Sequence, residues 1–143
     1  MPCIVIVPPS GFAALGMVKN GVQSWPAAGP ASWTPITTWT PNGGSSVDGS
    51  NRLVIVGGGP GRTIAAAAPF DGGTFNRTHQ IRLVDQSGNV LASSPVESVN
   101  VGTCTIPATT VDLTLVTAIQ MQGAGTDSWC GNLQPSGCFV TVT

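Results

Sequence analysis

Alternating apolar and polar positions are clearest in residues 78–94, THQIRLVDQSGNVLASS. Ile81 and Leu83 fall on one face of an extended segment there. Gln80 and Arg82 fall on the other face. A period of two predicts a half-buried β-strand. The sequence DQSGN follows and supplies turn residues, of which glycine and asparagine readily take positive φ. Residues 78–94 are therefore predicted to form two strands joined by a tight turn.

Other short apolar or alternating runs are separated by turns rich in glycine and proline. No stretch shows a sustained 3.6-residue period, so no long helix is expected. Asn20-Gly21 between two short runs predicts a hairpin over residues 17–24. Further strands are predicted at residues 53–56, 63–68, 96–106, 111–122 and 138–142. The predicted fold class is all-β, an antiparallel β-sandwich or jelly roll with an extended N-terminal arm.

The N-terminal arm is a β-branched run, CIVIV, that Pro8-Pro9 ends because proline cannot donate to a strand ladder. Two interpretations are open: the run is a device that links subunits, or it is a first edge strand of the domain. We assign residues 1–16 to the arm and residues 17–143 to a single domain. The candidate assembly residues are Cys3, Ile4, Val5, Ile6 and Val7.

Composition changes the picture of the surface. Charged residues make up 8% of the 143 residues and the net charge is −1, against about 25% charged residues in an average soluble protein. Much of the surface is therefore expected to be buried against partners. There is no basic patch for a nucleic acid. No apolar stretch is long enough to cross a membrane, and the N-terminus lacks the basic start of a signal peptide.

Three tryptophans lie close together in the sequence: Trp25, Trp33 and Trp39. Such a group is typical of a core or a subunit interface, where tryptophan is enriched. An exposed platform for carbohydrate is the alternative. No carboxylate pair accompanies these residues, so glycan hydrolysis is not indicated.

Residues 53–68, LVIVGGGPGRTIAAAA, imitate the start of a dinucleotide site. That site needs glycines beside the pyrophosphate and then a helix N-terminus. Here Arg62 stands where the last small residue of the motif belongs, and Pro69 would stop the helix early. A strand, a glycine turn and a returning strand fit the residues better, and no cofactor is predicted.

The four cysteines form no C-x₂-C pair, so a zinc site is not supported. Cys130 and Cys138 bracket the segment CGNLQPSGC, which a disulfide could close. Free buried thiols are the alternative, and spacing alone does not decide between the two.

His79 is the single histidine, and no nucleophile elbow occurs in the chain. It is predicted to be a partly exposed strand residue. The carboxylates are scattered singly and mostly lie beside glycine or serine in predicted turns, where they cap backbone donors. No catalytic or metal-binding residues are therefore predicted, and the chain is not expected to be an enzyme.

The segments NGVQSW, SWTPITTWTP and PFDGGTFNRTHQIRLVDQSGNVLAS resemble the small β-rich virion proteins of tailed phages that infect actinobacteria. QIRLVDQSGNVLASS, the late strand at 111–122 and the terminal FVTV are also similar to the C1q/TNF-like jelly roll. The resemblance extends over most of the chain from about residue 17. It implies a non-catalytic protein that forms trimers.

The resemblance implies a capsid decoration or minor capsid protein on the virion exterior, bound to the major capsid protein and to copies of itself. Two alternatives remain open. One is a minor tail protein bound to tail subunits. The other is a carbohydrate-binding adhesion module on the virion surface.

Overall fold

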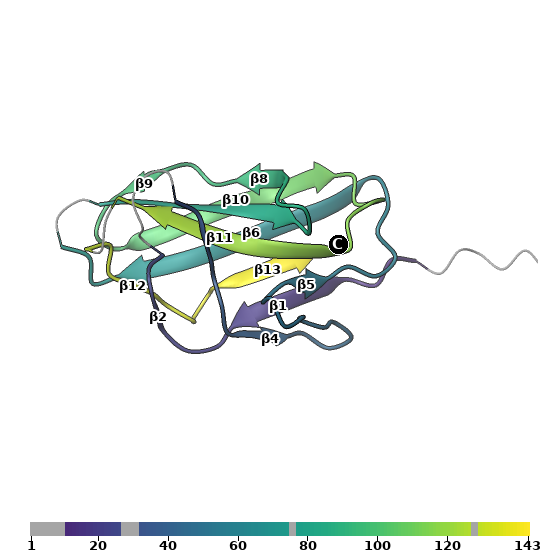
Figure 1. Cartoon of the computed structure of the whole chain (residues 1–143), viewed down its shortest axis with the longest axis horizontal. Helices are drawn as coiled ribbons and strands as arrows, with labels where there is room; N and C mark the ends of the chain where they lie inside the picture. The colour runs from purple at the N-terminus through teal and green to yellow at the C-terminus, as the bar shows by residue number, and fades with distance from the viewer. Residues whose placement is uncertain (1–10, 27–31, 75–76, 127–128) are drawn as a thin grey trace, which may run out of the picture.

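The computed structural model describes residues 11–26, 32–74, 77–126 and 129–143. Within these ranges every helix or strand assigned is a β-strand, and the paired strands run antiparallel. The strands form two sheets packed as a sandwich (Figure 1). The predicted all-β antiparallel sandwich is confirmed. No helix in the described ranges is long and apolar enough to cross a membrane.

The first sheet is built around one long central strand, which pairs with three others. Its order is β2 (Gln23–Ser24), β12 (Asn132–Leu133), β6 (Arg62–Asp71), β13 (Phe139–Val142), β1 (Leu15–Lys19) and β4 (Trp39–Pro41), and β10 (Gly102–Val111) also pairs with β6. Most neighbours in this sheet are distant in sequence. The chain therefore crosses repeatedly between the two sheets.

The second sheet carries the predicted hairpin. Its order is β3 (Thr34–Pro35), β11 (Ala118–Gly125), β7 (Thr78–Asp85) and β8 (Val90–Ser93), with β5 (Leu53–Val54) paired to β11 and β9 (Glu97–Ser98) paired to β7.

The core lies between the sheets and follows the period of two. β6 buries Ile64, Ala66 and Phe70 completely or almost completely, and β7 does the same with Ile81 and Leu83. Full burial of a large aliphatic or aromatic side chain contributes about 1.5–3 kcal/mol. A one-residue slip of either strand would expose its whole buried set, so burial fixes the register.

The hairpin predicted at residues 78–94 is confirmed. β7 and β8 pair, and the Asp85 N–H donates to the Asn89 carbonyl at 2.9 Å. Gly88 has φ +85, and its N–H donates to the Asp85 carbonyl at 3.1 Å. The Asp85 carboxylate accepts from the N–H groups of Ser87 and Asn89 at 2.8 and 2.9 Å. The residues of DQSGN therefore form the tight turn that the sequence predicts.

The hairpin predicted around Asn20-Gly21 is wrong. β1 pairs with β4 and β13, whereas β2 pairs with β12. Gly21 does take a positive φ of +77. The strand that follows it, β2, pairs with the distant β12 and not with β1. Lys19 Nζ donates to the carbonyls of Asn20 and Gly21 at 3.2 and 3.0 Å. Pairing with strands from elsewhere in the chain overrides the local turn signal.

The glycine segment at residues 57–61 connects two sheets, because β5 and β6 lie in different ones. The predicted local strand–turn–strand hairpin is therefore wrong. The dinucleotide interpretation also fails, because residues 62–71 are extended as β6. A close backbone approach explains the glycines: a Cβ on Gly58 would lie 2.2 Å from the Leu113 carbonyl oxygen. The Leu113 N–H donates to the Gly59 carbonyl oxygen at 2.8 Å.

The predicted boundary between arm and domain after residue 16 falls inside β1, so it is corrected to lie before Leu15. Leu15 and Met17 are core residues paired with β13. The candidate arm residues at 3–7 lie outside the described residues. The strands predicted at 96–106 and 111–122 are displaced toward the C-terminus, to β10 and β11.

The close approach of Gly58 to Leu113, in the connection between β5 and β6, can be tested by substitution. Gly58→Ala should destabilise the protein by at least about 2 kcal/mol, because its Cβ would collide with the Leu113 backbone. Gly57→Ala is the matched control: it has φ +68 but open space around its Cβ, so about 1 kcal/mol is expected. Urea unfolding measures both, and equal losses would contradict the close approach.

Candidate functional site

The three tryptophans singled out in the sequence occupy three different environments. Trp25 and Trp39 lie in the core, and their indole N–H groups donate to the carbonyls of Ala124 and Ile36 at 3.0 and 2.8 Å. Trp33 is half-buried, with the Arg82 guanidinium 4.4 Å from its ring centroid. Two of the indoles are thus enclosed and their polar atoms satisfied, so the three do not make a shared carbohydrate platform.

His79 is completely buried, so the prediction of a partly exposed strand residue is wrong. Its ring stacks on Phe70 with centroids 3.7 Å apart and planes 10° apart. Trp25 meets both rings edge-on, at 4.9 Å from His79 and 5.3 Å from Phe70. Since Phe70 lies on β6 and His79 on β7, this aromatic cluster joins the two sheets.

Both ring nitrogens of His79 approach backbone carbonyls. Nε2 lies 2.8 Å from the Cys130 oxygen and Nδ1 lies 3.1 Å from the Arg77 oxygen. A neutral imidazole has one N–H and can donate to one of them, whereas an imidazolium donates to both. Burial lowers the pKa of His79 below its ordinary 6.5, and the two carbonyls act in the opposite direction. The buried ring is therefore held mainly as the neutral form at neutral pH.

Cys130 and Cys138 are buried free thiols, so the disulfide alternative is not formed. The register of the first sheet explains why. Cys130 lies beside Gly73, and Cys138 precedes Phe139, which pairs with Ala67 on β6. On β6 itself, Asn132 pairs with Asp71 and Phe139 pairs with Ala67, four residues or roughly 13 Å apart, whereas a disulfide needs Cα atoms within about 7 Å.

The buried thiols are poorly suited to nucleophilic chemistry. Burial raises the pKa of Cys138 to about 12, although the nearby Lys19 ammonium acts in the opposite direction. Burial likewise raises the pKa of Cys104 to about 12. At neutral pH both are thiols, and the thiolate is the reactive form.

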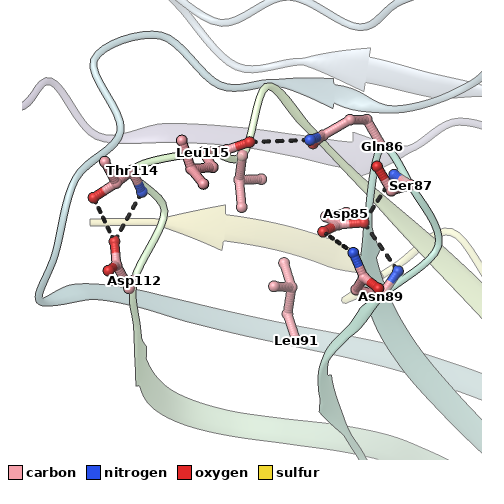
Figure 2. A pocket seen from close by; sticks show the side chains of 9 residues that line it. Asp85, Gln86, Ser87, Asn89, Leu91, Asp112, Thr114 and Leu115 are labelled. Atoms are coloured by element: carbon pink, nitrogen blue, oxygen red, sulfur yellow. Dashed lines mark hydrogen bonds between the residues drawn. The ribbon is translucent and has the colours of Figure 1, made fainter.

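A hollow of about 490 Å³ lies between the β7–β8 turn and the loop at residues 112–117. Figure 2 shows that its carboxylates are already engaged. Asp112 accepts from the N–H and the hydroxyl of Thr114 at 2.9 and 2.5 Å. The Asn89 side chain donates to Asp85 at 2.8 Å and is the largest cause of the lowered pKa of that carboxyl. These groups close turns and are not free to act on a ligand.

The described ranges contain no group of three histidine, cysteine or carboxylate residues placed to hold a metal ion.

The outer face of the first sheet carries small and apolar residues. One row crosses four strands in register: Val18, Phe139, Ala67 and Thr105 on β1, β13, β6 and β10. The side chains between them along each strand, such as Val140, are buried, so the row faces outward. We define the outer face as this row with Gly16, Thr141, Ala65, Pro69 and Thr103, all uncharged.

Sequence reasoning missed Trp129, which is the large hydrophobic residue of the loop before β12 and is 58% exposed. It is the fourth tryptophan and is separated from the other three by about ninety positions, so no local pattern pointed to it. It lines a second hollow, at the opposite end of the sandwich from the one in Figure 2.

Comparison with known proteins supports the fold. No protein-family model and no curated protein matches the chain. Among solved structures, Eiger TNF from S. frugiperda matches with a TM-score of 0.58 and 12% identity, over 92% of this chain and 90% of that one. Murine APRIL matches with a TM-score of 0.60 and 17% identity, over 90% of this chain and 95% of that one. The chain therefore has a TNF-like jelly-roll fold.

The buried histidine predicts a loss of stability in mild acid. The folded protein binds the His79 proton less tightly than the unfolded chain, so stability falls as the pH drops below about 6.5. Urea unfolding between about pH 7.5 and pH 5.5 measures this change. In the His79→Gln variant, the free energy of unfolding should depend less on pH in this range, since the chain has no other histidine. A wild-type protein that is equally stable or more stable at the lower pH would contradict the assignment.

Proposed function

We propose that this chain is a structural protein of a phage virion, a capsid decoration protein that associates with itself and reinforces the head lattice. The sequence resemblance to small phage virion proteins supports this role. The uncharged outer face of the first sheet is the single structural observation that carries it. A trimer is the assembly that the C1q/TNF-like resemblance implies.

The outer face suits burial for physical reasons. The row Val18, Phe139, Ala67 and Thr105 can be desolvated without stranding a charge, and burying an unpaired charge is costly. Val18, at one end of this row, is 40% exposed. A standard interface buries about 800 Å² on each partner.

The low content of charged residues also supports burial of this surface in an assembly. Charged residues are 8% of the chain, and some of these already pair with each other or are buried. Arg52 pairs with Asp48 at 2.7 Å, and Lys19 is buried. A surface with so few charges is poorly protected against association. Burial of the outer face in an assembly would account for this composition.

The apolar arm at residues 3–7 stays a prediction. We propose that it adds a strand to the sheet edge of a neighbouring subunit, a common mode of attachment between β-proteins.

The self-association surface can be tested by placing a charge on it. Thr105→Arg should raise the dissociation constant of the oligomer at least about a hundredfold, because the guanidinium would be buried without a partner. Thr105 is exposed in the single chain, so folding should be unaffected. Ser87→Arg, on the exposed β7–β8 turn, is the control. Sedimentation velocity measures both, and a Thr105→Arg protein that assembles like wild type would contradict this surface.

The virion role can be tested on particles. Immunogold labelling should mark heads, and particles made without the protein should lose infectivity faster on heating while keeping intact tails. Label on tails alone would replace the proposal by the minor tail alternative. Unlabelled particles would contradict both.

A further inference from the structure

A hollow of about 380 Å³ opens at the end of the sandwich where β2 and β12 lie (Figure 1). Its volume is within the range of small-ligand sites, about 300–1,000 Å³. Trp129 contributes an indole that is 58% exposed, whereas Trp25 is 4% exposed and lies at the base. The other lining residues are Ser24, Gly72, Thr74, Gly131 and Asn132.

The loop that carries Trp129 is held at three consecutive carbonyl groups. The Thr74 N–H donates to the Trp129 oxygen at 3.0 Å, and the Trp25 N–H donates to the Gly131 oxygen at 2.9 Å. Between them, His79 Nε2 lies 2.8 Å from the Cys130 oxygen. The backbone of residues 129–131 is therefore fixed by the sandwich itself. A preformed wall lowers the entropy cost of binding a ligand.

Gly131 fits this loop closely to the first sheet. It has φ +78, and a Cβ at this position would lie 2.1 Å from the Asp71 carbonyl oxygen. Only glycine allows this conformation and this approach together. The strand that follows then places Asn132 opposite Ser24 in register, with both side chains exposed on the same face.

The polar side chains in this hollow are available to a ligand. Among the described residues, the side chains of Ser24, Thr74 and Asn132 have no hydrogen-bond partner in another residue. The hollow in Figure 2 differs, because its Asp85 and Asp112 are engaged in their own turns. Two hydroxyls and one amide can each donate and accept.

We infer that this hollow binds a neutral saccharide, with Trp129 as its stacking surface and Ser24, Thr74 and Asn132 as its hydrogen-bonding groups. The C–H bonds on one face of a sugar ring carry partial positive charge and pack on the negative face of an indole. The hydroxyls at the ring edge pair with neutral groups that both donate and accept. None of the described lining residues carries a charge, which favours a neutral ligand over an ionic one.

This inference does not rest on the virion proposal. Its residues differ from those of the outer face, on which the virion proposal depends. A failure of either proposal leaves the other standing.

The test is a titration of the ¹⁵N-labelled protein with methyl glycosides of glucose, galactose, mannose and N-acetylglucosamine and with their oligomers. At least one of these should shift the Trp129 indole N–H signal saturably while the Trp33 and Trp39 signals stay in place. Sialic acid and a sulfated sugar are included as charged probes. A response to the charged probes alone would overturn the neutral assignment.

Two variants locate the site. Trp129→Ala should weaken binding by about tenfold or more, and Asn132→Ala should weaken it severalfold. Asn132 is exposed, so its variant should keep the fold even if the first does not. Trp33→Ala is the matched control and should bind like wild type. No saturable shift with any neutral probe, or unchanged binding by folded Asn132→Ala and Trp129→Ala proteins, would overturn the inference.

Discussion

The stack of Phe70 on His79 is the contact on which the rest of this molecule depends. The two rings come from opposite sheets, with centroids 3.7 Å apart, and Trp25 closes against both. The cluster therefore sets the spacing of the sandwich at one end. The same histidine reaches the Cys130 carbonyl at 2.8 Å and holds the loop of Trp129. One buried side chain thus links sheet packing to the geometry of the surface hollow.

The reactive side chains of the described residues are buried or already hydrogen-bonded. The three described thiols are buried, and the Asp85 and Asp112 carboxylates accept hydrogen bonds within their own turns. What faces outward is an uncharged sheet face and a hollow with a tryptophan. These two surfaces suit a protein that attaches to neighbours, and they lie on different residues, so one assembly can use both.

Local patterns in the sequence predicted the fold class because period-two alternation reports burial directly. Ile81 and Leu83 point inward as expected, and DQSGN closes its turn. The predictions at Asn20-Gly21 and at the glycine segment were wrong because strand pairing depends on residues far away, such as Leu113 beside Gly58. The burial of His79 and the hollow at Trp129 depend on three or more separate segments, which no window of sequence contains.

In the role that we propose, the outer face of the first sheet is buried in an assembly on the phage head. A cryo-electron microscopy reconstruction of the particle would show whether this face is covered. We expect this jelly roll on the capsid exterior, with Val18, Phe139 and Thr105 covered by neighbouring copies. Density that places the protein elsewhere, or on the head with this face open to solvent, would contradict it.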